Sequence, residues 1–533
     1  MTNSLKKLSE IRVVTFAFVL LSLSFSGCQS VNHWWNNGLR VGPNYSQPQA
    51  QVAAEYSMAN TERIDGSNVI DPQWWQVFND PDLNVLIDSL RQENLTLKAA
   101  CYRIKEARHQ RNIAAANLFP QSQQLTGSYS HTQSSTITES FVPGFSPVSL
   151  DNWSLGFDVG WEIDLWGRIR RSVEAADANL ESVVQDRNFA IVSLTAETAS
   201  LYINIRAFDE RIELAKKNAT LQEGSLKIAR ARFKEGRTSK LDVVQAESNL
   251  ASTRSLIPQL ELARRQSLNA IAVLLGMPPS EVPVLSDQPK KIPEIPSFAV
   301  VGIPADLMRR RPDIRSAERS MKAQFEQIGI AEADLYPTFS FSGSLGWDSA
   351  KLSDLVQSGG FAGSIAPAFG WNILNYGRLR EAICVEEARF KQIQMDFENT
   401  VLSAQREVED GIVEFVKRNE QYEYDLATQQ ANKESVELAI ASFKEGKTDF
   451  GRVFVVQTSL VTAQDQVVAT RASIALALIE TYRALGGGWE VYDAMATDLM
   501  VAEESVVPGS EVIVDATPVE QVIVPVNAES LQP

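Results

Sequence analysis

The sequence repeats itself at long range. Trp166-Gly167-Arg168 returns 210 positions later as Tyr376-Gly377-Arg378, and Phe233-Lys234-Glu235-Gly236 returns at the same interval as Phe443-Lys444-Glu445-Gly446. Asn117-Leu118-Phe119-Pro120 returns as Asp334-Leu335-Tyr336-Pro337 after 217 positions, so seven extra positions lie between these landmarks, in a loop. Two copies of one unit, each with short alternating segments and then a very long helix, indicate a duplicated half-barrel with a helical stalk more readily than a catalytic core.

Each copy contains two segments with the two-residue period of a β-strand. In the first copy, large apolar residues alternate with small or polar ones from Leu125 to His131 and from Trp153 to Ile163. In the second copy, Phe339 to Trp347 and Phe361 to Trp371 repeat this arrangement. Uncharged aromatic faces backed by small polar faces are typical of barrel strands that contact lipid and enclose a wet lumen. A soluble β-sandwich is the alternative interpretation of the same alternation.

Two very long helices are expected. Residues 168–235 and 378–445 contain no proline and one glycine each, Gly224 and Gly411. At about 1.5 Å per residue, each segment could form a rod of roughly 100 Å. Heptad-spaced apolar residues predict that the first rod packs lengthwise against a neighbour; they are Val184, Ile191, Leu194, Leu201, Ile205, Phe208 and Ile212. Such rods are far longer than an ordinary globular core requires.

A glycine and then a capping residue follow each rod. Gly236 and Gly446 suit the left-handed position just after a helix, and Ser239 and Asp449 suit the N-cap of a returning helix. We therefore expect return helices over residues 241–275 and 450–485. A further helix is expected over residues 82–118, before Pro120 stops it.

The N-terminus has the three parts of a secretory signal. Basic residues precede an apolar run, Val13 to Phe25, that is too short to span a bilayer as a helix, and the small residues Ser26 and Gly27 then precede Cys28. This layout resembles a bacterial lipoprotein signal. We therefore expect residues 1–27 to be removed and Cys28 to carry a covalent lipid. An ordinary signal with an incidental cysteine is the alternative.

The composition argues against several classes of function. The formal net charge of −16 opposes binding to nucleic acid, because phosphate neutralisation needs a Lys/Arg surface. The three histidines, His33, His109 and His131, have no metal-like spacing. The glycines at positions 486–488 follow a helix instead of opening one, which disfavours a phosphate cradle. We predict no enzymatic activity and no cofactor apart from the lipid on Cys28.

Two other groups of residues receive a structural interpretation. Glu407, Glu409 and Asp410 resemble a paired-carboxylate site, but they lie in the middle of the second rod and are expected to form a solvated helical face. Cys101 and Cys384 lie in helical patterns and are expected to be small buried apolar residues, because two lone cysteines do not make a disulfide framework.

Several motifs together carry a family resemblance. They are Val41-Gly42-Pro43-Asn44-Tyr45, Trp74-Trp75-Gln76-Val77-Phe78-Asn79-Asp80-Pro81, Arg310-Arg311-Pro312-Asp313-Ile314-Arg315 and Tyr482-Arg483-Ala484-Leu485-Gly486-Gly487-Gly488-Trp489. In this order, from about Cys28 to Trp489, the chain resembles the TolC-type outer membrane factors, in their lipoprotein NodT branch.

The resemblance implies a mostly α-helical protein with a transmembrane β-barrel. Each chain of a homotrimer would give four strands to one shared 12-stranded barrel in the bacterial outer membrane, and its helices would form a periplasmic tunnel. Closure by several chains also follows from physics, because four strands cannot close a barrel and open edges are not tolerated in lipid. The family docks onto a periplasmic adaptor (membrane fusion) protein and an inner-membrane RND-type pump, and it lets small molecules leave the cell.

These expectations divide the chain into six parts: a signal peptide (1–27), a lipidated N-terminal arm (28–81), a first repeat (82–276), a proline-rich linker (277–312), a second repeat (313–489) and an acidic disordered tail (490–533). Two other functions stay open. One is a structural, envelope-spanning coiled-coil lipoprotein without a pore. The other is the outer membrane component of a type I protein secretion system.

The resemblance also implies roles for the two turns at the ends of the rods. Phe233, Gly236, Ser239, Phe443, Gly446 and Asp449 would form the periplasmic tip and the adaptor-docking surface. Asp242 matches a tip acid of the family, whereas relatives place an acid at positions matching Arg452 or Val455. Asp242 and Arg452 are 210 positions apart, so we hypothesise that they alternate as acid and base around the gate. Alternatively, Asp242 is a helix cap that forms a capping box with Ser239.

Overall fold

The computed structural model describes residues 34–48, 51–53, 55–58, 61–65, 71–133, 149–279, 282, 285, 290–302 and 310–491. The expected signal peptide, Cys28 and His33 lie outside the described residues, as do parts of the linker and almost all of the expected tail. The chain divides into two units, Met1–Trp489 and Glu490–Pro533, and the elements described here belong to the first.

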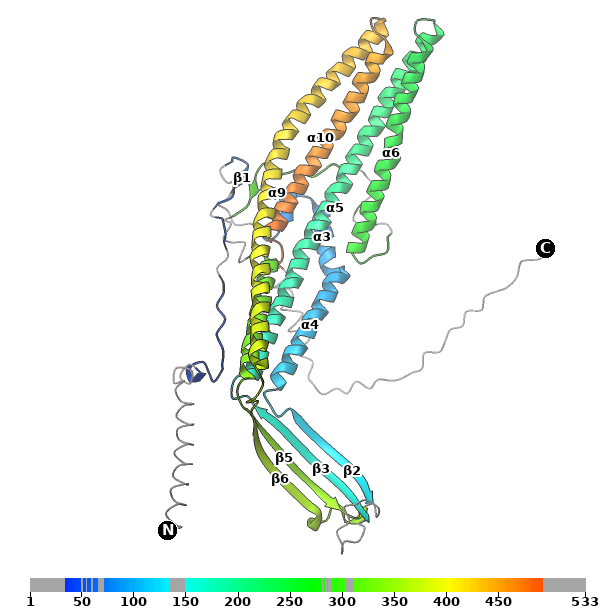
Figure 1. Cartoon of the computed structure of the whole chain (residues 1–533). Coiled ribbons are helices and arrows are strands. Elements are labelled where there is room, and N and C mark those ends of the chain that lie inside the picture. The colour runs from blue at the N-terminus through cyan, green and yellow to red at the C-terminus, as the bar shows by residue number, and fades with distance from the viewer. Residues whose placement is uncertain are drawn as a thin grey trace, which may run out of the picture. The chain divides into compact units, whose positions relative to one another are not determined.

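The described part of this unit is mostly helical, with one four-stranded sheet (Figure 1). Its helices are α3 (Pro81–Glu93), α4 (Leu95–Ala116), α5 (Arg168–Lys234), α6 (Lys240–Leu274), α8 (Pro312–Ala333), α9 (Arg378–Glu445) and α10 (Phe450–Ala484), with short 3-10 turns at η1 (Trp74–Phe78), η3 (Leu352–Asp354) and η4 (Ser358–Gly360). Its strands are β1 (Ile64–Asp65), β2 (Ser122–Gln133), β3 (Ser149–Ile163), β4 (Ala299–Val300), β5 (Thr338–Ser349) and β6 (Phe361–Gly370).

The two predicted rods are confirmed as α5, with 67 residues, and α9, with 68. Each begins after a glycine with positive φ, Gly167 or Gly377, which turns the chain out of the sheet. The return helices α6 and α10 start and end within one residue of their predicted bounds. No helix in the described ranges has an apolar stretch long enough to cross a membrane.

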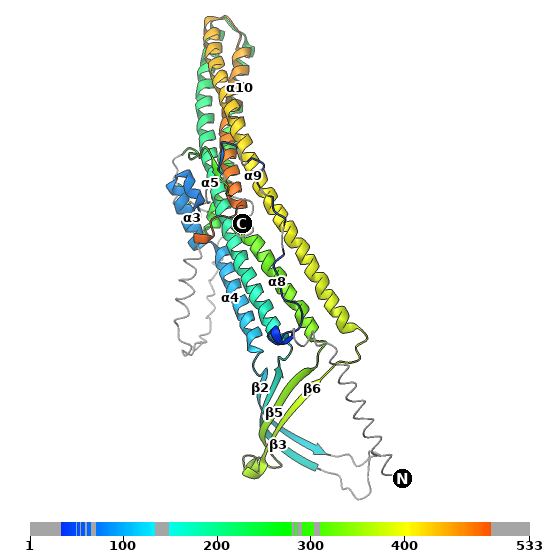
Figure 2. The ribbon, with the colours of Figure 1, turned by 90° about the vertical axis from the view of Figure 1, so that its left-hand side faces the viewer.

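Each rod packs against other helices along its length, and the neighbouring helix differs from one part of the rod to another. Helix α5 contacts α4, α6, α8 and α10, and α9 contacts α8 and α10 (Figure 2). Of the predicted heptad stripe, Ile191, Ile205 and Ile212 are buried, and the other members are only partly covered. Much of the buried surface of α5 is alanine or small polar side chains. Small residues let neighbouring helices approach closely, so one continuous apolar stripe is not required.

The single helix predicted over residues 82–118 is wrong, because the chain breaks at Asn94. Asn94 is extended, and its side chain accepts from the amide of Leu97 as the N-cap of α4. Its side-chain amide also donates to the carbonyl oxygen of Leu274 at the end of α6, at 2.7 Å. A long-range contact therefore fixes the break, and it is not visible in the local pattern.

The prediction that Cys101 and Cys384 are buried is also wrong, since both are exposed in the structure. The buried stripe of α4 is Leu97, Ala100, Ile104 and Ala107. Cys101 lies about 100° around the helix from Ala100, outside this stripe. Around Cys384, α9 has no buried residue between Leu379 and Phe397 in the described structure.

The sheet has the strand order β2-β3-β5-β6, and every neighbouring pair is antiparallel. Its register brings the predicted apolar residues onto a single face. Leu125 lies opposite Phe157, Phe157 opposite Leu345, and Trp161 opposite Phe341. The other face carries Ser, Thr, Gly and Ala in most rows, as in the row Thr126, Gly156, Gly346 and Ala362. The two-faced alternation predicted from the sequence is confirmed.

The two copies match at the level of single contacts. The indole N–H of Trp161 donates to the carbonyl oxygen of Leu118, and that of Trp371 donates to Leu335 in the same way, at 3.2 and 2.9 Å. The hydroxyls of Ser128 and Ser154 lie 2.7 Å apart, as do those of Ser344 and Ser364. Each copy therefore builds the same hairpin and the same junction between hairpin and helix.

Candidate functional site

The first tip joins α5 to α6 through a glycine turn and a capping box. Gly236 has φ +70°, and its amide donates to the carbonyl oxygen of Phe233 at 3.0 Å. The hydroxyl of Ser239 accepts from the amide of Asp242, while the carboxylate of Asp242 accepts from the amide of Ser239, both at 3.3 Å. The predicted capping box is confirmed.

The second tip has the same backbone course with a simpler cap. Gly446 has φ +79°, and its amide donates to the carbonyl oxygen of Phe443 at 3.1 Å. Asp449 is the N-cap of α10, and its carboxylate accepts from the amide of Arg452 at 3.2 Å. Both glycines and both capping residues thus have the local geometry that the sequence predicted.

The two tip phenylalanines differ in environment. Phe233 is 42% exposed, whereas Phe443 is 2% exposed and packs edge-to-face on Phe450. The guanidinium of Arg232 lies 5.0 Å above the Phe443 ring and donates to the carbonyl oxygens of Phe443 and Lys444. An arginine of the first tip therefore holds the last turn of α9, and residues of both tips share one apolar cluster: Ala219, Leu226, Ala229, Val243, Ala246, Leu250, Ala439, Phe443, Phe450 and Val453.

The two hypothesised gate residues also differ. Asp242 is only 9% exposed, and besides its cap bonds its carboxylate accepts from the hydroxyl of Thr238. Arg452 is exposed, and its guanidinium has no partner within the described part of the chain. The geometry confirms the cap role of Asp242. The gate role of the pair stays a prediction.

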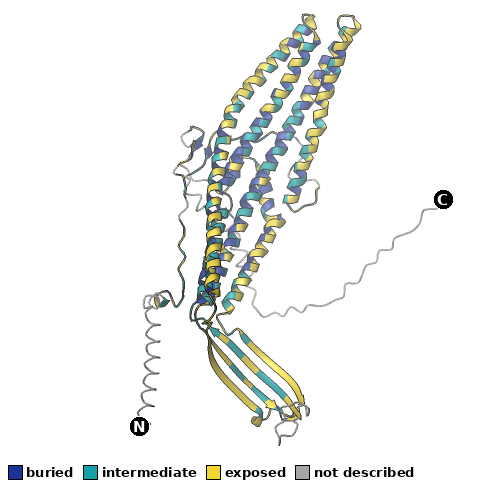
Figure 3. Ribbon diagram, in the orientation of Figure 1, coloured by how far each residue is buried: buried dark blue, intermediate teal, exposed yellow. Residues whose placement is uncertain are grey.

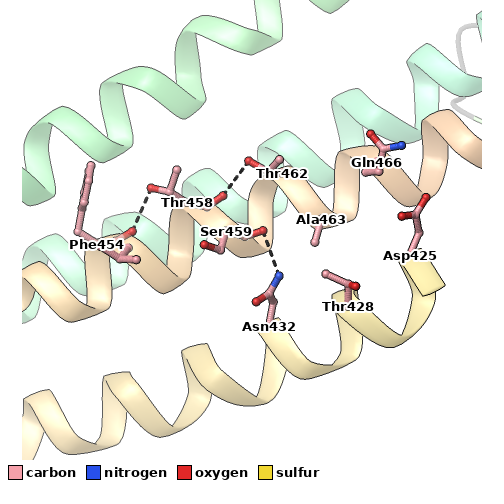
Figure 4. A pocket seen from close by; sticks show the side chains of 10 residues that line it. Asp425, Thr428, Asn432, Phe454, Thr458, Ser459, Thr462, Ala463 and Gln466 are labelled. Atoms are coloured by element: carbon pink, nitrogen blue, oxygen red, sulfur yellow. Dashed lines mark hydrogen bonds between the residues drawn. The ribbon is translucent and has the colours of Figure 1, made fainter. Parts of the chain in front are cut away.

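A groove of about 520 Å³ runs between α9 and α10 on the tip side of the molecule (Figure 4). The side-chain amide of Asn432 on α9 donates across it to the carbonyl oxygen of Ser459 on α10 at 3.4 Å. Its lining mixes hydroxyl, amide and apolar groups: Asp425, Thr428, Asn432, Phe454, Val455, Thr458, Ser459, Thr462, Ala463 and Gln466. This composition suits a contact with protein better than an enclosed ligand site.

The polar face of the sheet is the candidate lumen surface. It carries short hydroxyl side chains that bond across the strands, and the hydroxyl of Thr126 donates to the carboxylate of Asp158 at 3.1 Å. The opposite face is charge-free except near the end of the β2–β3 hairpin. There the carboxylate of Asp151 accepts from Tyr129 at 2.9 Å and lies 2.8 Å from the ring of His131.

The acids in the middle of α9 are not the uniformly solvated face that the sequence predicted. Glu407 accepts from Arg311 at 3.0 Å and from Arg483 at 3.5 Å, and Glu409 accepts from the amide of Ser57 at 2.7 Å. Asp410 alone is largely solvated, near Arg406. Glu407 and Glu409 join α9 to distant segments that cover this part of the helix, so the prediction of a solvated face is wrong for these two acids.

Sequence reasoning also missed what the motif residues do together. The indole N–H of Trp74 donates to the carbonyl oxygen of Gly487 at 3.3 Å, and its ring stacks on Tyr482. Gly486 has φ +73°, and a Cβ there would lie 2.9 Å from Arg311. Three segments far apart in sequence, which contain Trp74, Arg311 and Tyr482, thus meet at one buried junction. The sequence did carry a signal, because these motifs are rich in Trp, Arg or Gly, but only the fold shows that they form one shared site.

The described residues contain no group of three His, Cys, Asp or Glu side chains that could hold a metal ion. His109 is on α4, and His131 is on β2. The candidate site is therefore a set of surfaces: the two sheet faces, the tips and the groove between α9 and α10.

Comparisons with known proteins agree with this architecture. Residues 86–277 and 303–487 match the family described as outer membrane efflux protein. Nodulation protein T of Rhizobium leguminosarum bv. viciae is 30% identical over 455 residues, covering 84% of this chain and 90% of the relative. The pyoverdine export outer membrane protein OpmQ of Pseudomonas putida is 28% identical over 428 residues, covering 79% of this chain and 89% of that protein.

A solved structure matches closely as well. The outer-membrane channel OprN has a TM-score of 0.80 and 31% identity, covering 84% of this chain and 99% of that chain. The family match spans both repeats and both rods, and the structural match covers most of the chain. The chain therefore belongs to the outer membrane efflux protein family.

Proposed function

We propose that the chain forms, as a homotrimer, the outer membrane exit duct of a tripartite efflux system. Small molecules delivered from the periplasm would pass through the helical tunnel and leave through a barrel of twelve strands, four from each chain. Efflux at the outer membrane is the function of the family to which the chain belongs. The trimer, the closed barrel and the gate are our proposals for this chain.

The observation that carries the proposal is the four-stranded sheet with one apolar face and two open edges. Both edge strands, β2 and β6, are exposed along nearly their whole length (Figure 3). Unpaired backbone groups are not tolerated in lipid, so an apolar-faced open sheet needs closure by further copies. The polar face, with its Ser and Thr side chains, would then line a water-filled lumen.

We further propose that the two tips meet a periplasmic adaptor protein and, through it, an inner-membrane RND-type pump. The tips lie at the ends of the rods opposite the sheet (Figure 1). If the sheet lies in the outer membrane, Phe233, Gly236, Ser239, Phe443, Gly446 and Asp449 face the periplasm. The exposed ring of Phe233 and the groove between α9 and α10 offer apolar contact area for a helical partner.

The gate remains part of the proposal. Asp242 and Arg452 would alternate around the trimer and form weak ion pairs between neighbouring return helices. The free guanidinium of Arg452 supports this pairing, and the near burial of Asp242 within its own cap limits its strength. We also propose that Cys28 carries a lipid that anchors the mature chain to the membrane, with no other cofactor.

Conductance of the purified, full-length protein in planar bilayers tests the central claim. We expect discrete channel events, and we expect expression in a bacterium lacking its own exit duct to restore efflux of a fluorescent dye. A protein that inserts as a trimer but never conducts, even with Asp242→Arg at the tip, would instead support a structural lipoprotein without a pore. Secretion of a polypeptide without dye efflux would indicate type I protein secretion.

A further inference from the structure

The apolar face of the sheet carries one group of polar side chains, at the end of the β2–β3 hairpin farthest from the helices (Figure 1). His131 faces Asp151 across the two strands, and Tyr129 faces Trp153 two positions along the same face. We call these four residues the hairpin cluster. Among the residues of the four described strands, Asp151 is the only acid on the apolar face. Its position needs a physical reason, because this face contacts lipid in the proposed barrel.

The hairpin cluster leaves polar atoms open to the surroundings. The hydroxyl of Tyr129 and Nδ1 of His131 both contact Oδ1 of Asp151, at 2.9 and 2.8 Å, and Oδ2 has no partner among the described residues. Because an ionised carboxylate only accepts hydrogen bonds, Nδ1 of His131 carries a proton and Nε2 stays open. The side chains of His131 and Asp151 are 49% and 48% exposed. The pair therefore presents two polar atoms in a fixed arrangement.

Two aromatic rings form a shelf beside these atoms. The ring centroids of Tyr129 and Trp153 lie 4.4 Å apart, and Tyr129 is exposed. The hydroxyl of Tyr129 is bonded to Asp151, so the aromatic shelf and the open carboxylate oxygen belong to one unit. Exposed rings beside a hydrogen-bond acceptor are suited to sugars, because the C–H face of a sugar packs on a ring while its hydroxyl groups donate to the acceptor.

The length of β3 indicates the depth of the hairpin cluster in the membrane. Trp161 marks the inner edge, because its indole N–H donates to Leu118 where the sheet joins the helices. Asp151 precedes Trp161 by ten positions on the same strand. At about 3.4 Å per residue and a tilt of about 40°, this segment rises roughly 26 Å, close to the apolar band of about 25 Å in outer-membrane barrels. Asp151 therefore lies where the hydrocarbon ends and the outer headgroups begin.

We propose that the hairpin cluster binds the sugar headgroup of the glycolipid that forms the outer leaflet of the bacterial outer membrane, one molecule per chain. That headgroup is a phosphorylated amino-sugar with several hydroxyl and amide donors. Oδ2 of Asp151 accepts from these donors, the rings of Tyr129 and Trp153 pack on the sugar, and the acyl chains follow the apolar face past Phe157. This inference rests on the proposed barrel and adds a lipid ligand to it.

A sugar fits the hairpin cluster better than a bare phosphate. The carboxylate of Asp151 can only accept hydrogen bonds, and a phosphate offers it no donor and a charge of the same sign. The hydroxyl and amide groups of a sugar do donate, and a hydrogen bond to an ionised acceptor is stronger than one between neutral groups. The phosphates of the glycolipid then point away from Asp151, toward water.

Native mass spectrometry of the full-length trimer with added lipids tests the site. The probes are lipid A, lipid A without its phosphates, and phosphatidic acid, which carries a phosphate but no sugar. We expect the parent to retain up to one lipid A per chain and to bind the dephosphorylated form within a few-fold as well. Phosphatidic acid should bind several-fold more weakly, because it has no sugar to pack on the rings or to donate to Asp151.

Two variants and a matched control identify the residues responsible. Asp151→Ala removes the acceptor and Trp153→Leu removes part of the shelf but stays apolar, so each should weaken lipid A binding several-fold. Asp158→Ala is the control, because Asp158 lies on the same strand but on the polar face, where it accepts from Thr126 at 3.1 Å. Its lipid A binding should equal that of the parent.

The outcomes separate this inference from the proposed function. Equal lipid A binding by the parent and by trimers of Asp151→Ala and Trp153→Leu overturns the inference and leaves the exit duct standing. Binding of phosphatidic acid as tight as that of lipid A, or no binding of dephosphorylated lipid A, overturns it too, because the sugar is then not what is recognised. A protein that never forms a membrane-inserted trimer overturns both.

Thiol labelling in intact cells tests the depth of the hairpin cluster independently. The background is Cys101→Ser with Cys384→Ser, because both native thiols are exposed. Asp151→Cys should react with a membrane-impermeant maleimide added outside the cells, since the headgroup layer is hydrated. Phe157→Cys, which lies on the same face and closer to Trp161, should stay unlabelled. Labelling at both positions or at neither would place the cluster away from the outer headgroups and contradict the inference.

Discussion

Individual side chains explain why the two tips differ although their backbones match. Arg232 replaces solvent at the end of α9, because it donates to the carbonyl oxygens of Phe443 and Lys444 and covers the ring of Phe443. The residue 210 positions later is Ser442, whose side chain is too short to make the equivalent contact. Arg232 therefore links the first tip to the second tip within the chain.

Arg232→Ala should loosen the second tip by about 1–3 kcal/mol, because carbonyl groups at the end of α9 lose their charged donor. Hydrogen exchange of the amides from Ser442 to Arg452 should become faster. Arg230→Ala is the matched control, since Arg230 pairs with Glu247 on the surface and exposed pairs contribute about 0–1 kcal/mol. Equal protection in the parent and Arg232→Ala would mean that Phe443 alone holds the turn.

Asp242 can be tested as a cap and as a gate separately. Ser239→Ala removes the capping box but leaves the carboxylate, so it should destabilise the tip by about 1 kcal/mol without raising the resting conductance. Asp242→Arg should raise that conductance, and adding Arg452→Asp should partly restore closure. If Ser239→Ala and Asp242→Arg open the channel equally, Asp242 acts only as a cap.

Among the elements, the sheet has the sharpest division of roles between its faces. Phe157 lies on the apolar face and Ser154 on the polar face of the same strand. Phe157→Asp should cost roughly 1–4 kcal/mol in membrane insertion, depending on its depth, because the carboxylate would face lipid.

Ser154→Asp is the matched control for Phe157→Asp. Its charge would enter the polar row that already contains Asp348, so insertion should be nearly normal and only ion selectivity should change. Heat-modifiable mobility on gels and protease protection in vesicles measure the difference. The lipid-facing assignment would be reversed if Ser154→Asp failed to insert and Phe157→Asp succeeded.

For the molecule as a whole, a buried ionic contact joins the N-terminal arm to the helices. The guanidinium of Arg171 donates to the carbonyl oxygens of Val41 and Pro43 at 2.8 Å and to the carboxylate of Glu326 at 2.6 Å. Burial raises the pKa of Glu326 above the ordinary value, against the opposing charge of Arg171. The arm is thus fastened where α5 and α8 meet.

The raised pKa of Glu326 determines the direction in which its contribution to stability changes with pH. The folded protein binds more protons than the unfolded chain between the two pKa values, so this contribution is complete below about pH 4.3 and is lost as pH rises through the folded pKa of Glu326. Relative to Glu326→Gln, the parent should therefore lose thermal stability as pH rises from acidic values. Asp410→Asn, at a largely solvated carboxylate, is the control. Parallel stability curves for the parent and Glu326→Gln would contradict the pKa shift.

Local patterns were sufficient to predict the rods, the tip turns and the two faces of the sheet. A run of 67 residues without proline propagates as a helix, and a glycine followed by Ser239 or Asp449 stops and restarts it, whatever packs outside. Alternation along β3 likewise determines its faces, because a strand has a strict two-residue period. These features depend on neighbours within a few positions of the chain.

Features that depend on distant segments were not predictable in this way. Asn94 interrupts a helix because its side chain bonds to Leu274. Glu407 is ion-paired because Arg311 and Arg483 both reach it. Phe443 is buried and Phe233 is not, because Arg232 and Phe450 cover Phe443 alone. Burial depends on which elements lie side by side. Both tip motifs read Phe-Lys-Glu-Gly, so no local rule could have distinguished them. They are distinguished only by the packing of α5 against α10 and by the contact of Arg232 with the end of α9.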